Sequence, residues 1–523
     1  TNGLQMSGRA FGLHCYRSSV AGNTTVALHA AAVLKMFSQT NEGSGIYFRD
    51  AVGETSHVAV TVDTGSLIDI TAQYAFATCF YSPERLATGA ILSVNISGNG
   101  TVVRSTSLAN IVGGFGLGIW LTKVHDRGGG GAIHIVIEKN AALLALNAAS
   151  STNAANRGIQ VDGSIIDTLV IRVTFGAIVY ALANVLNGNG VYLGHSTFNN
   201  LLNVTVGGAG TVVAVTSNTG EAHGIIFDNI TAATALTWLV VTDAAEIRSE
   251  GLGSQIAFGI FFSRGCLHQL VVELSDAAVI RVKSASAEFS SGLTLYQVAA
   301  SSPATIDIRI TRRALLFVST ASSTASTFGI WMASVRMLPK ESPPTEAGKN
   351  ERTMAISVVV ATAANVTVTN TGRSAVIGYS FVCAAVYFEG SNYLPDRVPV
   401  VDSNRSAENG QFSLVVRDGA SLVARHETLG AVTVGLLGMA LSQLSLEVSD
   451  GGSLTTIGAL SGSHGVRVDN STCLGQVRVV FDRATCACHV VSRQGSTTAE
   501  SDAQREGTLV MMTYGFVGGN VTI

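Results

Sequence analysis

The sequence is poor in charge, in proline and in cysteine. Of its 523 residues, 13% are Asp, Glu, Lys or Arg, about half the usual share, and the net charge is −3. No acidic or basic block occurs among them, and without a basic stripe nucleic acid is not an expected partner. No uncharged apolar run reaches the roughly 18 residues of a membrane-spanning helix, so we expect no membrane span in this segment.

Cysteine is too scarce for a fold built on disulfides. Seven cysteines, an odd number, are scattered along the chain. On a strand Cys486 and Cys488 would share a face, and one of them could form a disulfide with Cys473. An equally good interpretation is that most cysteines are small core residues. No Cys-x-x-Cys pair or Cys/His spacing indicates zinc, and we expect no metal site.

Glycosylation sequons are spread over the whole chain. Asn95, Asn203, Asn365 and Asn520 begin strand-like stretches whose alternation directs Asn and Thr outward and Val inward, and we expect N-linked glycans there first. The chain begins Thr-Asn-Gly-Leu-Gln, without an initiator Met or a signal peptide, which suggests a processed product or an excised segment. We expect an extracellular or cell-surface location. The nine Asn-x-Ser/Thr sequons are at Asn23, Asn95, Asn99, Asn203, Asn229, Asn365, Asn404, Asn470 and Asn520.

The chain is rich in one repeat centred on glycine. Gly, an aliphatic residue, a variable residue and an apolar residue recur at intervals of mostly 32 to 40 residues, for example at Gly118, Gly224, Gly259 and Gly329. The residues between two copies also follow a repeated plan. A strand in which apolar and polar residues alternate is followed by a short turn of Asp, Gly, Ala or Arg and then by a second strand of the same kind. Such a period is typical of a solenoid or an array.

The alternation of apolar and polar residues assigns the two faces of each strand. A period of two is the pattern of a half-buried strand, and helical periodicity is missing almost everywhere. In 304–310 and 328–335 the predicted inward residues are Ile306, Ile308, Ile330 and Met332, and the predicted outward residues are Asp307, Arg309 and Trp331.

Three short strands per repeat, joined by tight turns, predict an all-β parallel β-helix, since each strand can pair only with its copies in neighbouring repeats. The crossover rule makes it right-handed. We expect about 12 or 13 coils with uncapped ends, a single domain over 1–523, and insertion loops at 338–353 and 389–410. Glycine would stand at a sharp corner before the third strand, where a positive φ or a close backbone approach is needed.

The first alternative to a structural role is catalysis, because several β-helix families are polysaccharide lyases or hydrolases. Their sites need clustered carboxylates, and the outward positions of the first strands give no such pair in neighbouring coils. His223 and His464 precede the third-strand glycine, and we interpret them as solvated corner residues without nearby acids. The Gly-rich 127–132 lacks the Lys and the helix of a phosphate loop. We predict no catalytic residue and no cofactor, and a lyase or hydrolase is the less favoured alternative.

Aromatic residues take the outward position of the third strand in several coils. They would form a stripe along the β-helix unless links, insertion loops or glycans cover it. An uncovered stripe would be a lateral interface or a sugar-stacking surface. The residues of this stripe are Tyr47, Trp120, Tyr192, Phe261 and Trp331.

Three features of the sequence resemble those of a known family: strands rich in Val, Ala, Ser and Gly, the sequons, and the turns Ser-Asp-Gly-Gly-Ser-Leu (449–454) and Arg-Asp-Gly-Ala-Ser-Leu (417–422). In these features the chain resembles, over nearly its whole length, the dispersed gene family surface glycoproteins of trypanosomes and their free-living kinetoplastid relatives. The fold that this resemblance implies is a β-helix of the pectin-lyase-like type. The resemblance implies a cell-surface or shed glycoprotein of structural or adhesive role, with no catalytic residues to carry over. The membrane spans expected at the C-terminal end of such proteins are not present in this sequence.

The two ends of the sequence read as parts of one coil. Residues 10–19 match a third strand, with Gly12 in the corner slot, and 518–523 match the start of a first strand. Neither end shows a polar or helical cap. We therefore expect a structural subunit that stacks head-to-tail into a filament or cell-surface fibre, with copies of itself and N-linked glycans as partners. The alternative is a carbohydrate-binding adhesin segment of a longer surface protein.

Overall fold

The structure is a computed structural model, and its described residues form strands and turns without a helix. The chain falls into two compact units, Thr1–Phe261 and Phe262–Ile523. The described residues are 10–16, 22–39, 42–49, 57–73, 77–83, 89–108, 115–123, 131–147, 155–185, 187–253, 256–285, 288–322, 325–337, 354–372, 383–390, 410–458, 463–469, 471–473, 476–482, 487–492, 505–506, 508–513, 516–517 and 521–522.

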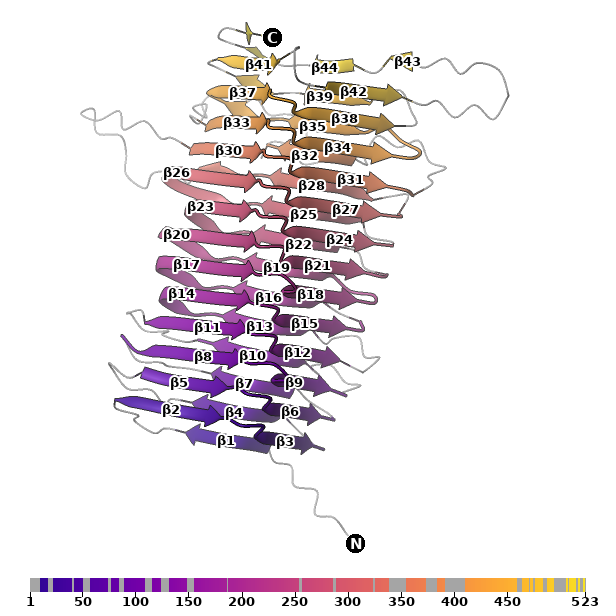
Figure 1. Cartoon of the computed structure of the whole chain (residues 1–523). Helices are drawn as coiled ribbons and strands as arrows, with labels where there is room; N and C mark the ends of the chain where they lie inside the picture. Colours follow the sequence, from indigo (N-terminus) through magenta and orange to yellow (C-terminus); the bar gives the residue numbers. More distant parts are fainter. Residues whose placement is uncertain are drawn as a thin grey trace, which may run out of the picture. The chain divides into compact units, whose positions relative to one another are not determined.

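In the first unit each strand pairs in parallel with the strand three places further along the chain, so that the chain winds through three sheets (Figure 1). Sheet 1 contains β2 (Asn23–Leu28), β5 (His57–Val62), β8 (Ile91–Ser97), β11 (Ala132–Glu138), β14 (Ile165–Thr174), β17 (Thr197–Gly207) and β20 (Thr231–Thr242). Sheet 2 contains β3 (Val33–Ser38), β6 (Leu67–Ala72), β9 (Val102–Ser107), β12 (Ala142–Asn147), β15 (Ile178–Ala183), β18 (Val212–Ser217) and β21 (Glu246–Gly251). Sheet 3 contains β1 (Ala10–Tyr16), β4 (Gly43–Arg49), β7 (Ala77–Pro83), β10 (Gly116–Thr122), β13 (Asn156–Asp162), β16 (Gly188–Gly194), β19 (Ala222–Asp228) and β22 (Ile256–Ser263), within which the first unit ends.

The second unit repeats this plan. Its strands of the sheet 1 type are β23 (Cys266–Leu274), β26 (Ala299–Ile310), β30 (Met354–Val360), β33 (Gly410–Val416), β37 (Gln443–Val448), β41 (Val477–Phe481) and β46 (Val521–Thr522). Those of the sheet 2 type are β24 (Val279–Ser284), β27 (Leu315–Thr320), β31 (Asn365–Asn370), β34 (Ser421–His426), β38 (Ser453–Gly458), β42 (Ala487–Ser492) and β43 (Arg505–Glu506), which runs antiparallel to β42. Those of the sheet 3 type are β25 (Phe289–Tyr296), β28 (Ser326–Ala333), β32 (Cys383–Glu389), β35 (Val432–Leu437), β39 (His464–Asp469) and β44 (Thr508–Thr513). Short strands complete the unit: β29 (Arg336–Met337), which pairs with β26, and a small sheet of β36 (Ala440–Leu441), β40 (Thr472–Cys473) and β45 (Phe516–Val517).

This architecture is a parallel β-helix of the right-handed type with three strands per coil, as the sequence predicts. The expected insertion loop 338–353 lies outside the described residues, as do residues 391–409 of the second. The expectation of a single domain over the whole chain stays a prediction.

The predicted faces are confirmed in the second unit. Ile306, Ile308, Ile330 and Met332 are each at most 1% exposed, and they pack into the interior of the coil. Outside, Asp307 pairs with Arg309 through the Arg309 Nη2 and a carboxylate oxygen, and about half of the arginine side chain reaches solvent. The alternation of apolar and polar residues in the sequence therefore predicts correctly which of these side chains face the interior of the coil.

The repeated glycine is explained by a close approach between coils. A Cβ built on Gly118 would lie 2.5 Å from the carbonyl oxygen of Gly158 in the next coil and 2.7 Å from Leu143 Cδ1 of sheet 2. Gly224 meets Gly259 O and Ile247 in the same way, at 2.5 and 2.4 Å. Neither glycine has a positive φ. Of the two predicted reasons, the close approach is confirmed for these coils and the positive φ is wrong.

Positive φ is found instead in the turns between sheet 1 and sheet 2 and, at single residues such as Lys123 and His195, directly after strands of sheet 3. Lys139 (φ 57°) and Asn140 (φ 60°) are consecutive left-handed residues, as are Asp276 and Ala277. The amide of Asn140 donates to Phe175 O of the next coil at 3.0 Å. The hydrogen-bond ladder thus continues around the corner, at a backbone cost of roughly 1–2 kcal/mol per left-handed non-Gly residue.

Candidate functional site

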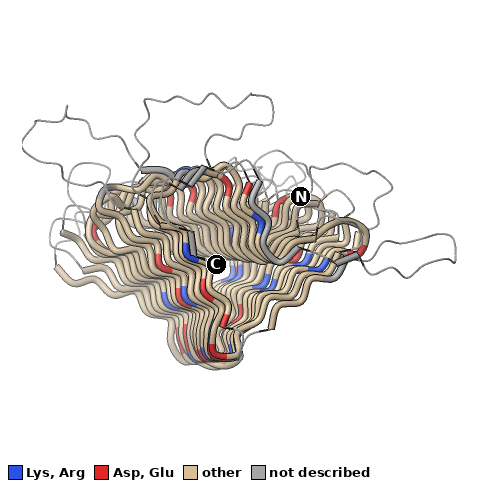
Figure 2. Tube along the Cα trace, turned by 90° about the horizontal axis from the view of Figure 1, so that it is seen from above, with Lys and Arg blue, Asp and Glu red and all other residues tan. Residues whose placement is uncertain are grey.

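Charged residues are sparse along the described part of both units (Figure 2). In the described part of the chain no group of three or more His, Cys, Asp or Glu side chains is placed to hold a metal ion. The described residues also contain no helix that is both long enough and apolar enough to span a bilayer. The candidate functional surfaces are the outer faces of the sheets and the exposed coil at β1–β3.

The aromatic stripe begins as a ladder of rings on sheet 3. His14, Tyr47, Tyr81 and Trp120 follow one another in register, with ring centroids 4.8, 5.0 and 4.3 Å apart, and the last pair is stacked at 18°. These distances are close to the spacing of about 4.8 Å between neighbouring strands. Only the Tyr81–Trp120 pair packs face to face, because the other two pairs are T-shaped, with interplanar angles of 79° and 65°.

Most of the stripe is covered. Tyr47 is 2% exposed, Tyr192 7% and Trp331 9%, whereas Trp120 and Phe261 are half-buried. In the second unit Trp331 stacks on Phe289 and Phe328, with interplanar angles of 3° and 19°. Of these five residues, only Trp120 and Phe261 are exposed enough to stack on a sugar, so the sugar-stacking alternative depends on these two.

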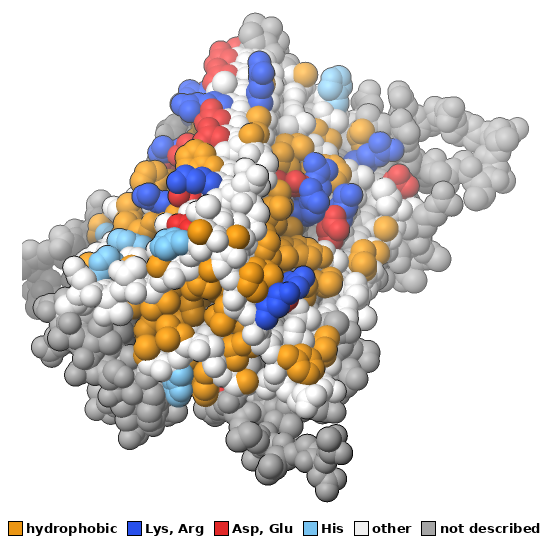
Figure 3. Space-filling model, turned by 60° about the horizontal axis from the view of Figure 1, so that its bottom comes forward, with side chains coloured by type: hydrophobic (Ala, Val, Ile, Leu, Met, Phe, Trp, Pro, Cys, Tyr) orange, Lys and Arg blue, Asp and Glu red, His pale blue; other side chains and the backbone are white. Residues whose placement is uncertain are grey.

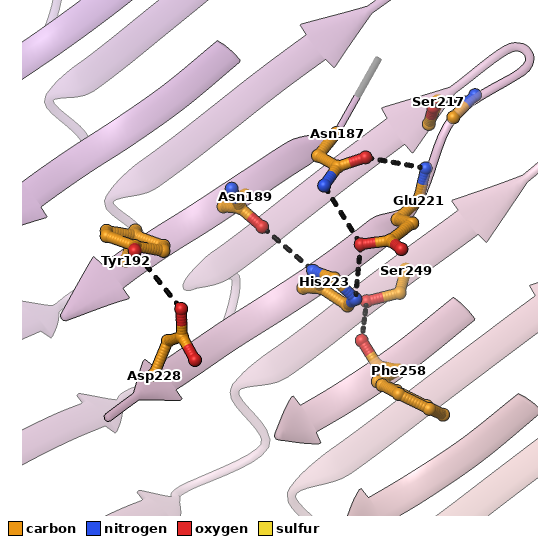
Figure 4. Close-up of polar contacts among 10 residues, drawn as sticks. Asn187, Asn189, Tyr192, Ser217, Glu221, His223, Asp228, Ser249 and Phe258 are labelled. Carbon is orange, nitrogen blue, oxygen red and sulfur yellow. Dashed lines mark hydrogen bonds and ion pairs between the residues drawn. The ribbon is translucent and has the colours of Figure 1, made fainter. Parts of the chain in front are cut away.

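A polar cluster follows the aromatic ladder along sheet 3. Arg157, Asn189 and His223 occupy the same register position in β13, β16 and β19, one residue before the close-approach glycine. Tyr192 and Asp228 lie beside them on the same outer face, as Figure 4 shows for all but Arg157. The sequence signal for this cluster was available, because the residue before the glycine changes from Leu to Arg, Asn and His in consecutive coils.

His223 is buried, so the interpretation of a solvated corner histidine without nearby acids is wrong. It is 2% exposed, its Nδ1 lies 3.0 Å from Asn189 Oδ1, and its ring lies against Phe258. Its Nε2 lies 3.7 Å from Glu221 Oε2, beyond hydrogen-bond range. Burial, together with the nearby charge of Arg157, lowers the pKa of His223 to about 3, so the imidazole is neutral at pH 7.

His464 corrects the same interpretation in the second unit. Its side chain is 8% exposed, and burial together with Arg467 lowers its pKa. A histidine before the third-strand glycine is therefore a covered residue in both units, because the outer face of sheet 3 is packed rather than open.

The rest of the polar cluster is arranged around Tyr192. The Arg157 guanidinium carbon lies 3.7 Å from the centroid of the Tyr192 ring, a cation–π contact. The Tyr192 hydroxyl lies 3.4 Å from Asp228 Oδ2, and burial, with Asp228 and Asp162 nearby, raises the tyrosine pKa to about 12. A Cβ on Gly194 would meet this ring at 2.4 Å, so glycine there makes room for it.

Glu221 completes the cluster at its outer edge. Its Oε2 accepts a hydrogen bond from Asn187 Nδ2 at 2.9 Å, and burial together with Asp228 raises its pKa. A neutral buried histidine beside a carboxyl of raised pKa can hold side chains of neighbouring coils together. The imidazole itself is 2% exposed, so it contacts side chains of neighbouring coils rather than solvent.

The sequons lie on the outside wherever they are described. Asn95, Asn203 and Asn365 are half-exposed outward residues of β8, β17 and β31, as their alternation predicts. Asn23, Asn99 and Asn229 are exposed. The sequons Asn404, Asn470 and Asn520 lie outside the described residues. Glycosylation itself stays a prediction at all of them.

The cysteines of the possible disulfide are only partly described. Cys488 lies half-buried in β42. Cys486 and the side chain of Cys473 lie outside the described residues, so that pairing stays a prediction. Elsewhere Cys79 and Cys383 are buried, which fits small core residues.

The first coil, β1–β3, presents an apolar edge. The inward residues Leu34 and Met36 of β3 are half-exposed, although their register partners Ile68 and Ile70 in the coil above are 2% and 0% exposed. Two outward residues of the same strand, Val33 and Phe37, are 61% and 56% exposed. Figure 3, turned to bring this side forward, shows hydrophobic side chains at the surface.

Comparison with known proteins gives no relative to set beside this geometry: no family model, no curated protein and no solved structure matches the chain.

Proposed function

We propose that the chain is an extracellular structural glycoprotein that stacks head-to-tail with copies of itself, using the first coil as one of the two contact surfaces. The observation that carries the proposal is the half-exposed inward face of β3 beside the exposed Val33 and Phe37. Exposed apolar surface of this kind is seldom left without a partner.

A second copy is the occupant that fits the edge best. Among the described strands, β1, β2 and β3 each pair on one side only, with β4, β5 and β6. Their other sides offer rows of N–H and C=O groups at the spacing of a parallel sheet. A coil of the same three-strand plan can satisfy all three rows and cover Leu34 and Met36 together. A contact between two different surfaces repeats without closing, which builds a filament.

Sedimentation and electron microscopy of the full chain over a range of concentrations test the proposal. We expect rods that lengthen with concentration and dissociate in SDS to a chain of 54.1 kDa once glycans are removed. Phe37→Lys should lower the rod length, because it places a charge at the apolar edge. Phe175→Lys is the matched control, since Phe175 is 65% exposed on a turn away from the first coil.

Three outcomes would overturn head-to-tail stacking. Uniform short particles at all concentrations would show that the edge has no partner. A closed dimer would show that two first coils meet each other. Equal effects of Phe37→Lys and Phe175→Lys would show that the apolar edge is not the contact. A natural chain far heavier than 54.1 kDa after denaturation would instead support a segment of a longer repeat protein.

The adhesin alternative rests on the half-buried Trp120 and Phe261 of sheet 3. It fits the resemblance to kinetoplastid surface glycoproteins equally well, and polysaccharide cleavage is the weakest alternative. Binding to an array of glycans, compared with Trp120→Ala, separates the adhesin from the structural subunit. Release of reducing or unsaturated sugars from acidic polysaccharides would favour the enzyme.

A further inference from the structure

The outer face of sheet 1 in the first unit carries an exposed tryptophan next to a sequon. β14, β17 and β20 lie side by side (Figure 1), and Asn203 of β17 is in register with Trp238 of β20. Trp238 is 39% exposed. The half-buried residues around the pair are Val170, Leu201, Leu236 and Val240. Asn203 thus lies among apolar side chains, with Thr205 as the polar residue beside it.

The sequon is held in a defined arrangement on this face. Thr205 Oγ1 donates a hydrogen bond to Asn203 Oδ1 at 3.0 Å, so the two polar residues of Asn-Val-Thr contact each other directly. Asn365 and Thr367 make the same contact in β31, at 2.6 Å. The register neighbours of Asn365 are Leu315 and Ser421, neither of them aromatic. The two sequons therefore differ mainly in the tryptophan.

We propose that Asn203 carries an N-linked glycan whose first sugar packs on the indole of Trp238. This rests on the proposed extracellular glycoprotein, because attachment requires passage through a secretory compartment. Asn203 Nδ2 forms a bond to the anomeric carbon of a sugar carried on a lipid diphosphate. The bond from that carbon to the diphosphate oxygen breaks, the lipid diphosphate leaves, and the amide gives up one proton without any change of oxidation state.

The geometry favours packing over a freely projecting glycan. Residues in register on neighbouring strands lie about 4.8 Å apart, which is within reach of a sugar attached to one and a ring on the other. An indole offers a large rigid apolar face at little cost in conformational entropy. A sugar on this face would cover Trp238 and the apolar side chains beside it, which accounts for a patch that is otherwise left in solvent.

Acrylamide quenching of tryptophan fluorescence tests the contact in the secreted full chain. The chain has three tryptophans, of which Trp120 is half-buried and Trp331 is 9% exposed, so a change in quenching reports mainly on Trp238. We expect a glycan on the peptide that contains Asn203. Removing it by Asn203→Gln should raise the quenching constant. Thr205→Ala, which destroys the sequon but keeps Asn203, should raise it equally.

Asn365→Gln is the matched control, and it should lose a glycan without changing the quenching. An unmodified Asn203 in a chain that is glycosylated at other sequons would overturn the proposal. So would a glycan at Asn203 whose loss leaves the quenching unchanged. A chain without any glycan would overturn both this inference and the glycoprotein part of the proposed function. Rod formation is measured separately, and it tests the part of the proposed function that concerns head-to-tail assembly.

Discussion

The first coil and the coil above it have the same fold and different environments. β3 and β6 pair residue by residue, with Leu34 beside Ile68 and Met36 beside Ile70. The two isoleucines are buried, whereas the leucine and methionine are half-exposed. An inward side chain in this fold is therefore buried by the coils on both sides of it. A coil covered on one side only keeps its hydrogen-bond pattern but loses much of its core.

The largest expected effect comes from placing a charge in the two environments. Ile70→Asp puts an unpaired carboxylate into a coil covered on both sides, and we expect a loss of several kcal/mol in the free energy of unfolding. Met36→Asp at the open coil should cost about 1 kcal/mol or less, because the carboxylate can reach water. Chemical denaturation followed by circular dichroism measures both.

Equal losses in the two variants would contradict the comparison, since they would show that Met36 is as well covered as Ile70. The Met36→Asp protein should also form shorter rods, if the first coil is the assembly surface. A stability loss without any change in rod length would separate the core from the interface.

The second effect is a dependence of the free energy of unfolding on pH. It arises from the buried histidine on the outer face of sheet 3. His223 has a pKa of about 3 in the folded protein and about 6.5 when unfolded, so the unfolded chain binds more protons between these values. Stability should therefore be complete above pH 6.5 and fall as the pH drops towards 3. The difference between a pKa of 6.5 and one of about 3 corresponds to at most about 5 kcal/mol of the free energy of unfolding.

The raised pKa of Glu221 acts in the opposite direction. Its folded carboxyl holds a proton where the unfolded one is ionised, so its contribution falls as the pH rises above about 4.5 through the folded pKa. His223→Gln should flatten the loss of stability on the acidic side, as measured by denaturation at a series of pH values. His14→Gln, in the exposed first coil, controls for the substitution. An unchanged acid slope in His223→Gln would contradict the assignment.

The third effect compares the same glycine position in the two environments. Gly118→Ala would place a methyl group against Gly158 O and two atoms of Leu143, all under 3.0 Å, and overpacking of this kind typically costs about 1–3 kcal/mol. Gly12→Ala in β1 meets Gly45 O at 2.5 Å, but its side-chain neighbours are Leu34 and Met36 of the open coil. We expect a smaller loss of melting temperature there, and a larger one would contradict the comparison.

The sequence predicts the interior better than the outer face for a physical reason. A period of two along one strand fixes which side of that strand is inward, and this was sufficient for Ile306 and Ile330. Whether an outward residue is exposed depends on its neighbours in the adjacent coils. Trp331 and His223 both point outward and are both covered, by rings such as Phe289 and Phe258.

The glycine repeat shows the same limit. The positions of the repeat were clear from the sequence, but the choice between positive φ and close approach depends on the carbonyl of the next coil. The change from Leu117 to Arg157 and Asn189 before the repeated glycine marks polar residues in the sequence, but it does not show that Glu221 joins them or that they are buried. They come together only through the register of β13, β16 and β19.

The smallest expected effect concerns the left-handed turns. Ala244, between β20 and β21, has φ 58°, and Ala31, between β2 and β3, has φ 61°. Glycine removes the strain of this conformation but adds entropy to the unfolded chain, which leaves a net gain of about 0.5 kcal/mol. Ala244→Gly should raise the melting temperature slightly. Ala31→Gly should raise it less, because a coil covered on one side opens before the rest unfolds and contributes little to the global transition. Equal gains measured by scanning calorimetry would show that the first coil unfolds together with the interior. The inward residues of β3 would then be poorly covered, but the first coil would be no less stable than the coils of the interior.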